Sequence, residues 1–97
     1  MKPGSRDTKA YLQFTLKELD LLQENTEYMT ECFGLDSRIE KLTGKRKVGF
    51  YAWDLESLEE VLFWVEREHA ELYDPETMVS LRTKINEAKA FIEQAKF

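Results

Sequence analysis

The sequence predicts a small, mainly α-helical domain of three or four helices, in which the last two helices form an antiparallel hairpin. Apolar residues recur at helical spacing over residues 55–72 and again over residues 78–92. Helix-start signals precede both stretches, and few residues separate them. With 97 residues, 42% of them hydrophobic, the chain can bury one core but not two. We therefore expect a single domain over residues 9–97.

The N-terminal residues 1–8 contain Pro, Gly and Ser without any periodic pattern, which predicts a flexible N-terminus. Residues 9–14 then alternate between apolar and polar side chains. This alternation is typical of a short strand, although the same residues could lead directly into a helix.

The first helix is expected to begin at Leu16 and to end at Gly34. Thr15 and Glu18 have the spacing of a capping box, in which a hydroxyl and a carboxylate each accept a hydrogen bond from the backbone at a helix start. The acids of this helix repeat at steps of three and four residues, which is typical of a solvated side. They are Asp20, Glu24, Glu27 and Glu31. Its apolar arc is wide enough for more than one neighbour and comprises Leu19, Leu21, Leu22, Tyr28, Met29, Cys32 and Phe33.

A short second helix is expected to be capped by Asp36 and Ser37 and to extend through Leu42. Residues 48–53 follow a polar loop and are rich in aromatic side chains. They could form a strand that pairs with residues 9–14, which would make a short two-stranded β element, or an extended linker packed against the helices. We favour the linker.

The third helix is expected to start with Asp54 as its N-cap, and the fourth to run from Pro75 to about Ala95. The short connection between them requires an antiparallel hairpin. The inward stripe of the third helix comprises Leu55, Leu58, Val61, Leu62, Val65, His69 and Leu72. That of the fourth comprises Met78, Leu81, Ile85, Ala88 and Ile92.

Phe63 and Trp64 lie off the inward stripe, so the third helix is apolar on a second side. Charged residues surround this aromatic pair, which is typical of a protein contact rather than of a catalytic cleft. Alternatively, residues 50–53 or the first helix cover Phe63 within the fold.

We predict a small acidic interaction or regulatory module that binds a protein partner or forms a homodimer. The residues assigned to this surface are Tyr51, Trp53, Glu60, Phe63, Trp64 and Arg67. Phe91 and Phe97, which also lie off the main stripe, favour a surface for self-association.

Nucleic acid is not the expected partner, because the chain has 19 acids against 14 Lys and Arg, and these bases supply most of the affinity for phosphate backbones. Lys45, Arg46 and Lys47 are the exception and could contact a phosphate. A nucleic-acid-associated factor therefore remains the first alternative. In its second form, acid-rich helices dock onto a basic DNA-binding partner, since residues 54–76 hold nine acids and one base.

Glu66 and His69 have the Glu-x-x-His spacing found in metal-binding carboxylate bundles. Such a site needs two copies of the motif, and this chain has a single histidine, so only a symmetric dimer could complete it. We interpret His69 as a half-buried member of the apolar stripe and expect no metal or other cofactor. A metal-dependent carboxylate bundle is the second alternative.

Catalytic motifs such as a glycine-rich phosphate loop are missing from the sequence, so we expect no enzymatic activity.

The longest apolar run, Val61–Val65, is far shorter than the roughly 20 residues that cross a membrane. Cys32 is the only cysteine, and no hydrophobic signal segment follows the basic start of the chain. These features predict a cytoplasmic protein with no membrane contact.

Overall fold

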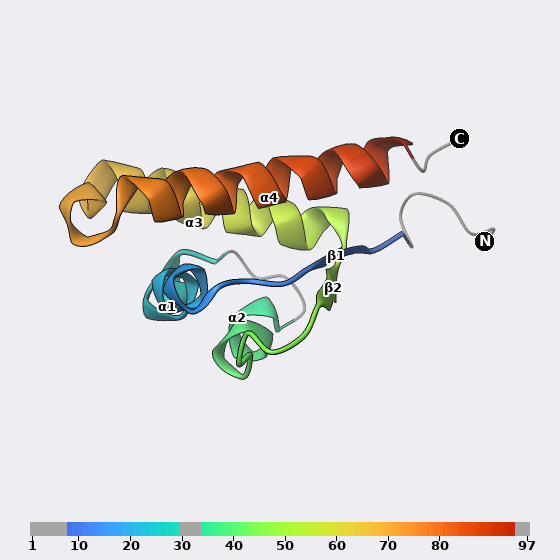
Figure 1. Ribbon diagram of the computed structural model, residues 1–97, viewed down its shortest axis with the longest axis horizontal. Helices are drawn as coiled ribbons and strands as arrows, with labels where there is room; N and C mark the ends of the chain where they lie inside the picture. The colour runs from blue at the N-terminus through green and yellow to red at the C-terminus, as the bar shows by residue number, and fades with distance from the viewer. Residues whose placement is uncertain (1–7, 30–33, 95–97) are drawn as a thin grey trace.

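A computed structural model describes residues 8–29 and 34–94 of the chain. Within these residues it confirms a mainly α-helical fold with four α-helices and one short antiparallel sheet (Figure 1). Apart from Thr8, the predicted flexible N-terminus lies outside the described residues. In chain order the elements are β1 (Ala10–Leu12), α1 (Leu16–Glu24), the 3-10 turn η2 (Thr26–Tyr28), α2 (Leu35–Glu40), β2 (Val48–Phe50), α3 (Ala52–Glu68), the 3-10 turn η3 (Ala70–Leu72) and α4 (Pro75–Gln94).

The two long helices α3 and α4 form the antiparallel hairpin that the short connection predicts. They lie side by side along the long axis of the molecule, with α1 and the strands packed beneath them and α2 packed against α1 (Figure 1). The core lies between these two layers. From the hairpin, the predicted stripes supply Leu55, Leu58, Val61, Leu62, Val65, Met78, Leu81, Ile85, Ala88 and Ile92, all of which are buried.

The segment after the loop is a strand, so our preference for a linker is wrong. In β2, Phe50 lies opposite Ala10 of β1 and Val48 lies opposite Leu12. The pairing buries Phe50, and its ring packs at 5.8 Å from that of Phe14. The strand β2 finds its hydrogen-bond partners in β1, almost forty residues earlier in the chain. A pattern of three residues is too short to predict such a distant pairing.

The capping box at the start of α1 is confirmed, because the backbone N–H of Glu18 donates to the Thr15 hydroxyl and the backbone N–H of Thr15 donates to the Glu18 carboxylate. The predicted end at Gly34 is wrong, since α1 stops at Glu24. Asn25 is buried there, and its side-chain amide donates to the carbonyl of Leu21 at 2.8 Å. This local bond competes with the next helical turn. Of the expected arc and acidic stripe, Glu31, Cys32 and Phe33 lie outside the described residues.

Two predicted N-caps are also wrong. The short helix α2 begins at Leu35 behind Gly34, so Asp36 and Ser37 lie inside it, and it ends at Glu40 rather than at Leu42. Asp54 is the third residue of α3 rather than its cap. Its buried carboxylate accepts a hydrogen bond from the backbone N–H of Tyr51 at 3.0 Å and forms an ion pair with Arg38 at 2.8 Å. Asp54 therefore caps α3 from inside the helix and joins it to α2.

At its other end α3 is shorter than the predicted stripe, because it ends at Glu68. His69 is the residue that leaves the helix, and the turn η3 carries Leu72 out to solvent, where it is 66% exposed. The fourth helix, predicted from Pro75 to about Ala95, is confirmed over Pro75–Gln94.

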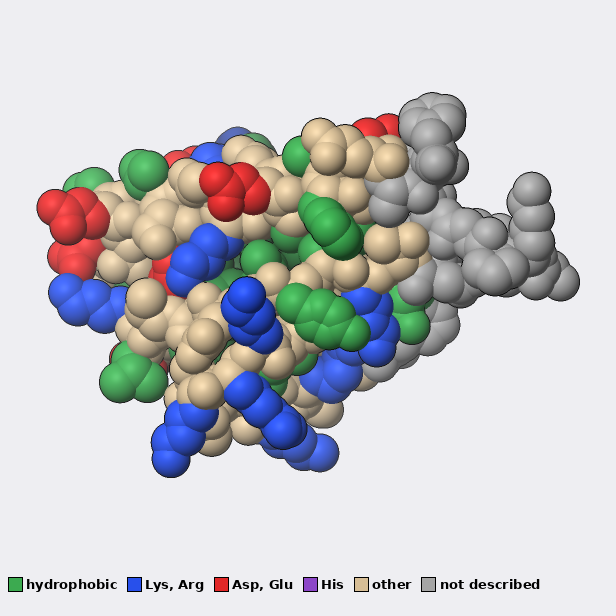
Figure 2. All heavy atoms as spheres, turned by 45° about the vertical axis from the view of Figure 1, so that its right-hand side comes forward, with side chains coloured by type: hydrophobic (Ala, Val, Ile, Leu, Met, Phe, Trp, Pro, Cys, Tyr) green, Lys and Arg blue, Asp and Glu red, His purple; other side chains and the backbone are tan. Residues whose placement is uncertain are grey.

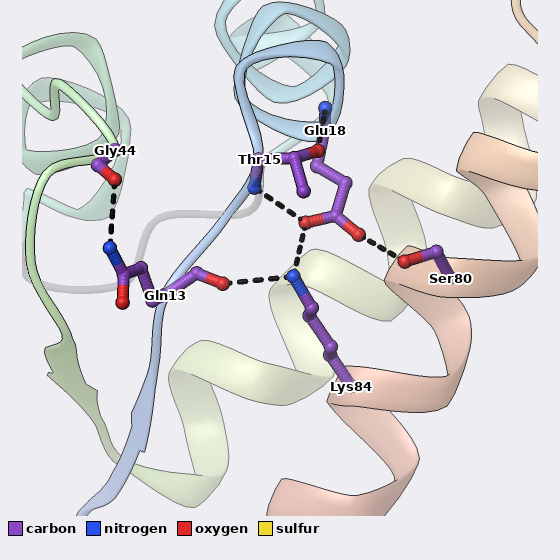
Figure 3. A network of polar contacts seen from close by, with 6 residues as sticks. All are labelled: Gln13, Thr15, Glu18, Gly44, Ser80 and Lys84. Atoms are coloured by element: carbon purple, nitrogen blue, oxygen red, sulfur yellow. Dashed lines mark hydrogen bonds and ion pairs between the residues drawn. The ribbon is translucent and has the colours of Figure 1, made fainter.

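A buried carboxylate connects the start of α1 to α4 (Figure 3). Glu18 is 1% exposed and accepts hydrogen bonds from Lys84 at 2.6 Å and from the Ser80 hydroxyl at 2.5 Å, besides the bond from Thr15. Lys84 also donates to the backbone carbonyl of Gln13 at 2.9 Å. Burial by itself raises the pKa of Glu18, but the hydrogen bonds from Lys84, Ser80 and Thr15 and the charge of Lys84 outweigh it and lower that pKa below its ordinary value of 4.5.

Replacing Lys84 with Met should lower the free energy of unfolding by about 3 kcal/mol, because it leaves the buried charge of Glu18 without its cation. Lys89→Met is a matched control on the same helix. Lys89 pairs with Glu59 at 2.7 Å, but both side chains are 39% exposed, so its loss should cost about 1 kcal/mol or less. Urea unfolding at neutral pH measures both changes in stability. Equal losses for the two variants would show that the buried Glu18–Lys84 pair contributes no more than the exposed Glu59–Lys89 pair.

The same pair predicts a pH dependence. Because folding lowers the pKa of Glu18, its contribution to stability is complete above 4.5, the ordinary value that applies to the unfolded chain. That contribution is lost as the pH falls below 4.5 and through the lower pKa of the folded state. Urea unfolding between pH 6 and pH 2 should therefore show a steeper loss for the wild type than for Lys84→Met.

Gly34 and Gly44 both have a φ of 80°, a backbone conformation that favours glycine. A Cβ on Gly44 would lie 3.2 Å from the backbone oxygen of Phe14, whereas a Cβ on Gly34 would meet nothing within 4 Å. Gly34→Ala should therefore cost roughly 1 kcal/mol from the left-handed backbone alone, and Gly44→Ala should cost roughly 2 kcal/mol or more. Urea unfolding measures the difference. An equal cost at the two positions would show that the loop around Gly44 can move away from Phe14 without loss of stability.

Candidate functional site: the outer face of helix α3

The side of α3 that points away from the core carries an exposed aromatic pair. Phe63 is 51% exposed and Trp64 is half-buried beside it, with ring centroids 5.3 Å apart and planes at 85°. This edge-to-face arrangement is a favourable one for two aromatic rings. Residues 50–53 and α1 leave Phe63 exposed, so the covering that the sequence left open as an alternative is not seen within the described residues.

Two opposite charges frame the pair. Glu60 and Arg67 are both exposed and stand seven residues apart, which places them on nearly the same line along the helix. The indole N–H of Trp64 donates to Glu60 Oε1 at 3.2 Å, and the guanidinium carbon of Arg67 lies 5.9 Å from the indole ring centre. We call Glu60, Phe63, Trp64 and Arg67 the outer face of α3.

Tyr28 of η2 supports the outer face from the side. Its ring stacks on that of Trp64 with centroids 6.1 Å apart and planes 12° from parallel. Its hydroxyl forms a hydrogen bond of 2.9 Å with Nε2 of His69. The sequence analysis placed Tyr28 in the apolar arc of a longer helix and missed this role. No local signal could reveal it, because Tyr28 and Trp64 are far apart in the chain.

The other two residues assigned to the surface, Tyr51 and Trp53, lie at the opposite end of α3. Their rings stack with centroids 4.6 Å apart, and Lys9 lies over the Tyr51 ring at 5.1 Å. Trp53 and Trp64 are eleven positions apart, which is about 16 Å along the helix axis. They therefore form a second aromatic pair rather than part of the outer face.

Of the two phenylalanines expected to extend the self-association surface, Phe91 does not join the outer face. Phe91 is 55% exposed and lines a hollow beside β1, together with Tyr11 and Ala88. Phe97 lies outside the described residues.

Glu66 and His69, the candidate metal ligands, have other partners. Glu66 forms an ion pair of 2.7 Å with Arg82, and Nε2 of His69 is engaged with Tyr28. In the described ranges, no three His, Cys, Asp or Glu side chains lie close enough together to hold a metal ion.

Lys45, Arg46 and Lys47 lie on the exposed loop between α2 and β2. Figure 2 shows Lys and Arg side chains gathered along the lower edge of the molecule, at the height that α2 has in Figure 1. Lys45 and Arg46 line a hollow next to β1, whereas Lys47 does not. The sequence predicted the charge of this loop but not the hollow.

Fold and surface together define a small α-helical domain with a two-stranded sheet and an exposed aromatic helix face. Comparison with protein-family models, with curated proteins and with solved structures finds no match to this chain. Among the described residues, no helix has the length and apolar character needed to span a membrane. The assignment of function therefore depends on the geometry of the surface.

The stacking of Tyr28 on Trp64 predicts a measurable coupling between them. A double-mutant cycle of Tyr28→Ala and Trp64→Ala should give about 0.5–1.5 kcal/mol of coupling in the free energy of unfolding. The same cycle with Tyr51→Ala and Trp64→Ala is the control and should give a value near zero, since Tyr51 lies at the other end of α3. Coupling of equal size in both cycles would argue against a specific contact between Tyr28 and Trp64.

Proposed function

We propose that this protein is a small interaction module that self-associates through the outer face of α3. One observation carries the proposal: the charges of this face are symmetric about its aromatic pair. Glu60 precedes Phe63 by three residues, and Arg67 follows Trp64 by three residues. Between these two charges, the exposed ring of Phe63 and the indole of Trp64, which stacks on Tyr28, offer an apolar contact surface.

Such a face is complementary to itself when two copies of α3 meet antiparallel. A two-fold axis between positions 63 and 64 places Glu60 of each copy opposite Arg67 of the other, because both lie about 5 Å from the axis along the helix. The same axis brings Phe63 of each copy against Trp64 of the other. Opposite charges then meet at both ends of an aromatic centre, which is the usual composition of a protein contact.

The size of the outer face favours a reversible dimer. An interface centred on a single helix falls at the small end of protein contacts, below about 1,200 Å². Most of its affinity is expected from the aromatic pair, since aromatic residues are enriched among those that dominate binding. The net charge of −5 favours a protein over a nucleic acid as the partner. We place the module in the cytoplasm, where the single Cys32 stays reduced.

Charge reversal tests the proposed pairing. Glu60→Arg and Arg67→Glu should each abolish the dimer, because each places like charges opposite one another. A mixture of the two single variants should form a heterodimer, since both junctions then join opposite charges again. Light scattering with size-exclusion chromatography over a tenfold range of concentration measures the mass, and circular dichroism checks that helical content is unchanged.

Two further variants complete the experiment. Phe63→Ala should also give a folded monomer, because it removes the exposed ring at the centre of the face. Glu87→Arg, on the exposed side of α4, is the control for charge reversal and should leave the dimer intact. A wild type that stays monomeric, or single variants that remain monomeric when mixed, would refute the proposal.

A further inference from the structure

The loop between α2 and β2 borders a hollow of about 340 Å³ beside β1. Its floor is apolar and consists of Leu12 and Phe14, which are buried, and of Leu42 and Val48, which are partly buried. This volume lies within the range of small-molecule sites in proteins.

The rim of the hollow carries the exposed cations Lys41, Lys45 and Arg46. None of them has a carboxylate partner among the described residues, and Lys47 next to them has none either. The nearest acid in the sequence, Glu40, accepts a hydrogen bond from Thr26 at 3.4 Å. The remaining described cations each contact a carboxylate or an aromatic ring, and these are Lys9, Lys17, Arg38, Arg67, Arg82, Lys84 and Lys89.

The loop between α2 and β2 is held in place by contacts with Gln13 and Phe14. Gln13 donates its side-chain amide to the carbonyl of Gly44 at 3.1 Å (Figure 3). Gly44 also approaches the backbone of Phe14 too closely for any larger residue to fit without a shift. The carbonyl of Gln13 is bound in turn by Lys84 of the Glu18 network. The rim is therefore positioned by the same contacts that join α1 to α4, and the hollow is largely formed before any ligand arrives.

We propose that this hollow binds a small amphipathic anion, in which a carboxylate or phosphate is attached to a short apolar chain. The unpaired cations would hold the anionic group, and the apolar floor would cover the chain. The floor offers no exposed aromatic ring on which a nucleobase could stack, since Phe14 is 4% exposed. This favours a small amphipathic anion over a nucleic acid at the same loop.

Four probes separate the two halves of the ligand. Octanoate and octyl phosphate carry both a charge and a chain, 1-octanol carries the chain alone, and acetate carries the charge alone. In titrations followed by backbone amide NMR, octanoate or octyl phosphate should shift the resonances of residues 41–48 and bind at least tenfold more tightly than 1-octanol or acetate. The stronger of the two also identifies whether the anionic group is a carboxylate or a phosphate.

Matched variants locate the site. The double variant Lys45→Gln, Arg46→Gln should weaken binding at least tenfold, whereas Lys47→Gln, on the same loop but outside the hollow, should change it less than twofold. Val48→Thr keeps the shape of the floor but replaces a methyl group with a hydroxyl, so it should weaken binding of the chain-bearing probes severalfold and leave acetate unchanged.

Three results would overturn the proposal. The first is the absence of shifts at residues 41–48 with either chain-bearing probe. The second is acetate or 1-octanol binding as tightly as octanoate and octyl phosphate, which would show that only one half of the ligand is recognised. The third is a single-stranded oligonucleotide that binds more tightly than either chain-bearing probe and that Lys47→Gln weakens as much as the double variant does, which would indicate phosphate-backbone contact along the loop.

Discussion

The buried carboxylate of Glu18 is the contact on which the arrangement of this fold depends. A charge in the interior is tolerated only where other groups satisfy it, and Glu18 has Lys84 and Ser80 of α4 and the backbone of Thr15 around it. These partners come from two segments of the chain, so the pair sets how α1 lies against α4. Lys84 extends the connection to Gln13, which in turn holds the loop after α2 at Gly44. One charge thus positions the end of β1, the start of α1, the long hairpin and the loop.

Asp54 has the same role at the start of α3. Like Glu18, it is the third residue of its helix, it is buried, and it accepts a hydrogen bond from the backbone N–H three residues before it. Both carboxylates also receive a cation from another helix, Lys84 in one case and Arg38 in the other. Each helix start is therefore fixed twice, once by local capping and once by tertiary contact.

Local signals predicted the elements whose stabilising contacts lie within a few residues. The capping box of Thr15 and Glu18 and the start of α4 at Pro75 are examples, because helix caps involve neighbours in the chain. The inward stripe of α4 and that of α3 as far as Val65 were predicted as well, since helical periodicity is independent of what packs against it. The predicted stripe failed only at His69 and Leu72, which lie beyond the end of α3. The predicted end of α1 failed at Asn25, where a side-chain hydrogen bond to the backbone competes with the helix.

The sequence alone therefore determined the helical class, the hairpin and the position of Phe63 off the core stripe, because helical periodicity fixes which side of α3 each side chain occupies. Only the structure showed that Phe63 is exposed rather than covered by residues 50–53 or α1. The tertiary structure decided that residues 48–50 pair with β1, that Tyr28 supports Trp64, and that Lys45 and Arg46 border an apolar hollow. Each of these joins segments far apart in the chain. Which distant segments meet is set by the packing of the whole core and by its few buried charges, and no short stretch of sequence contains that information.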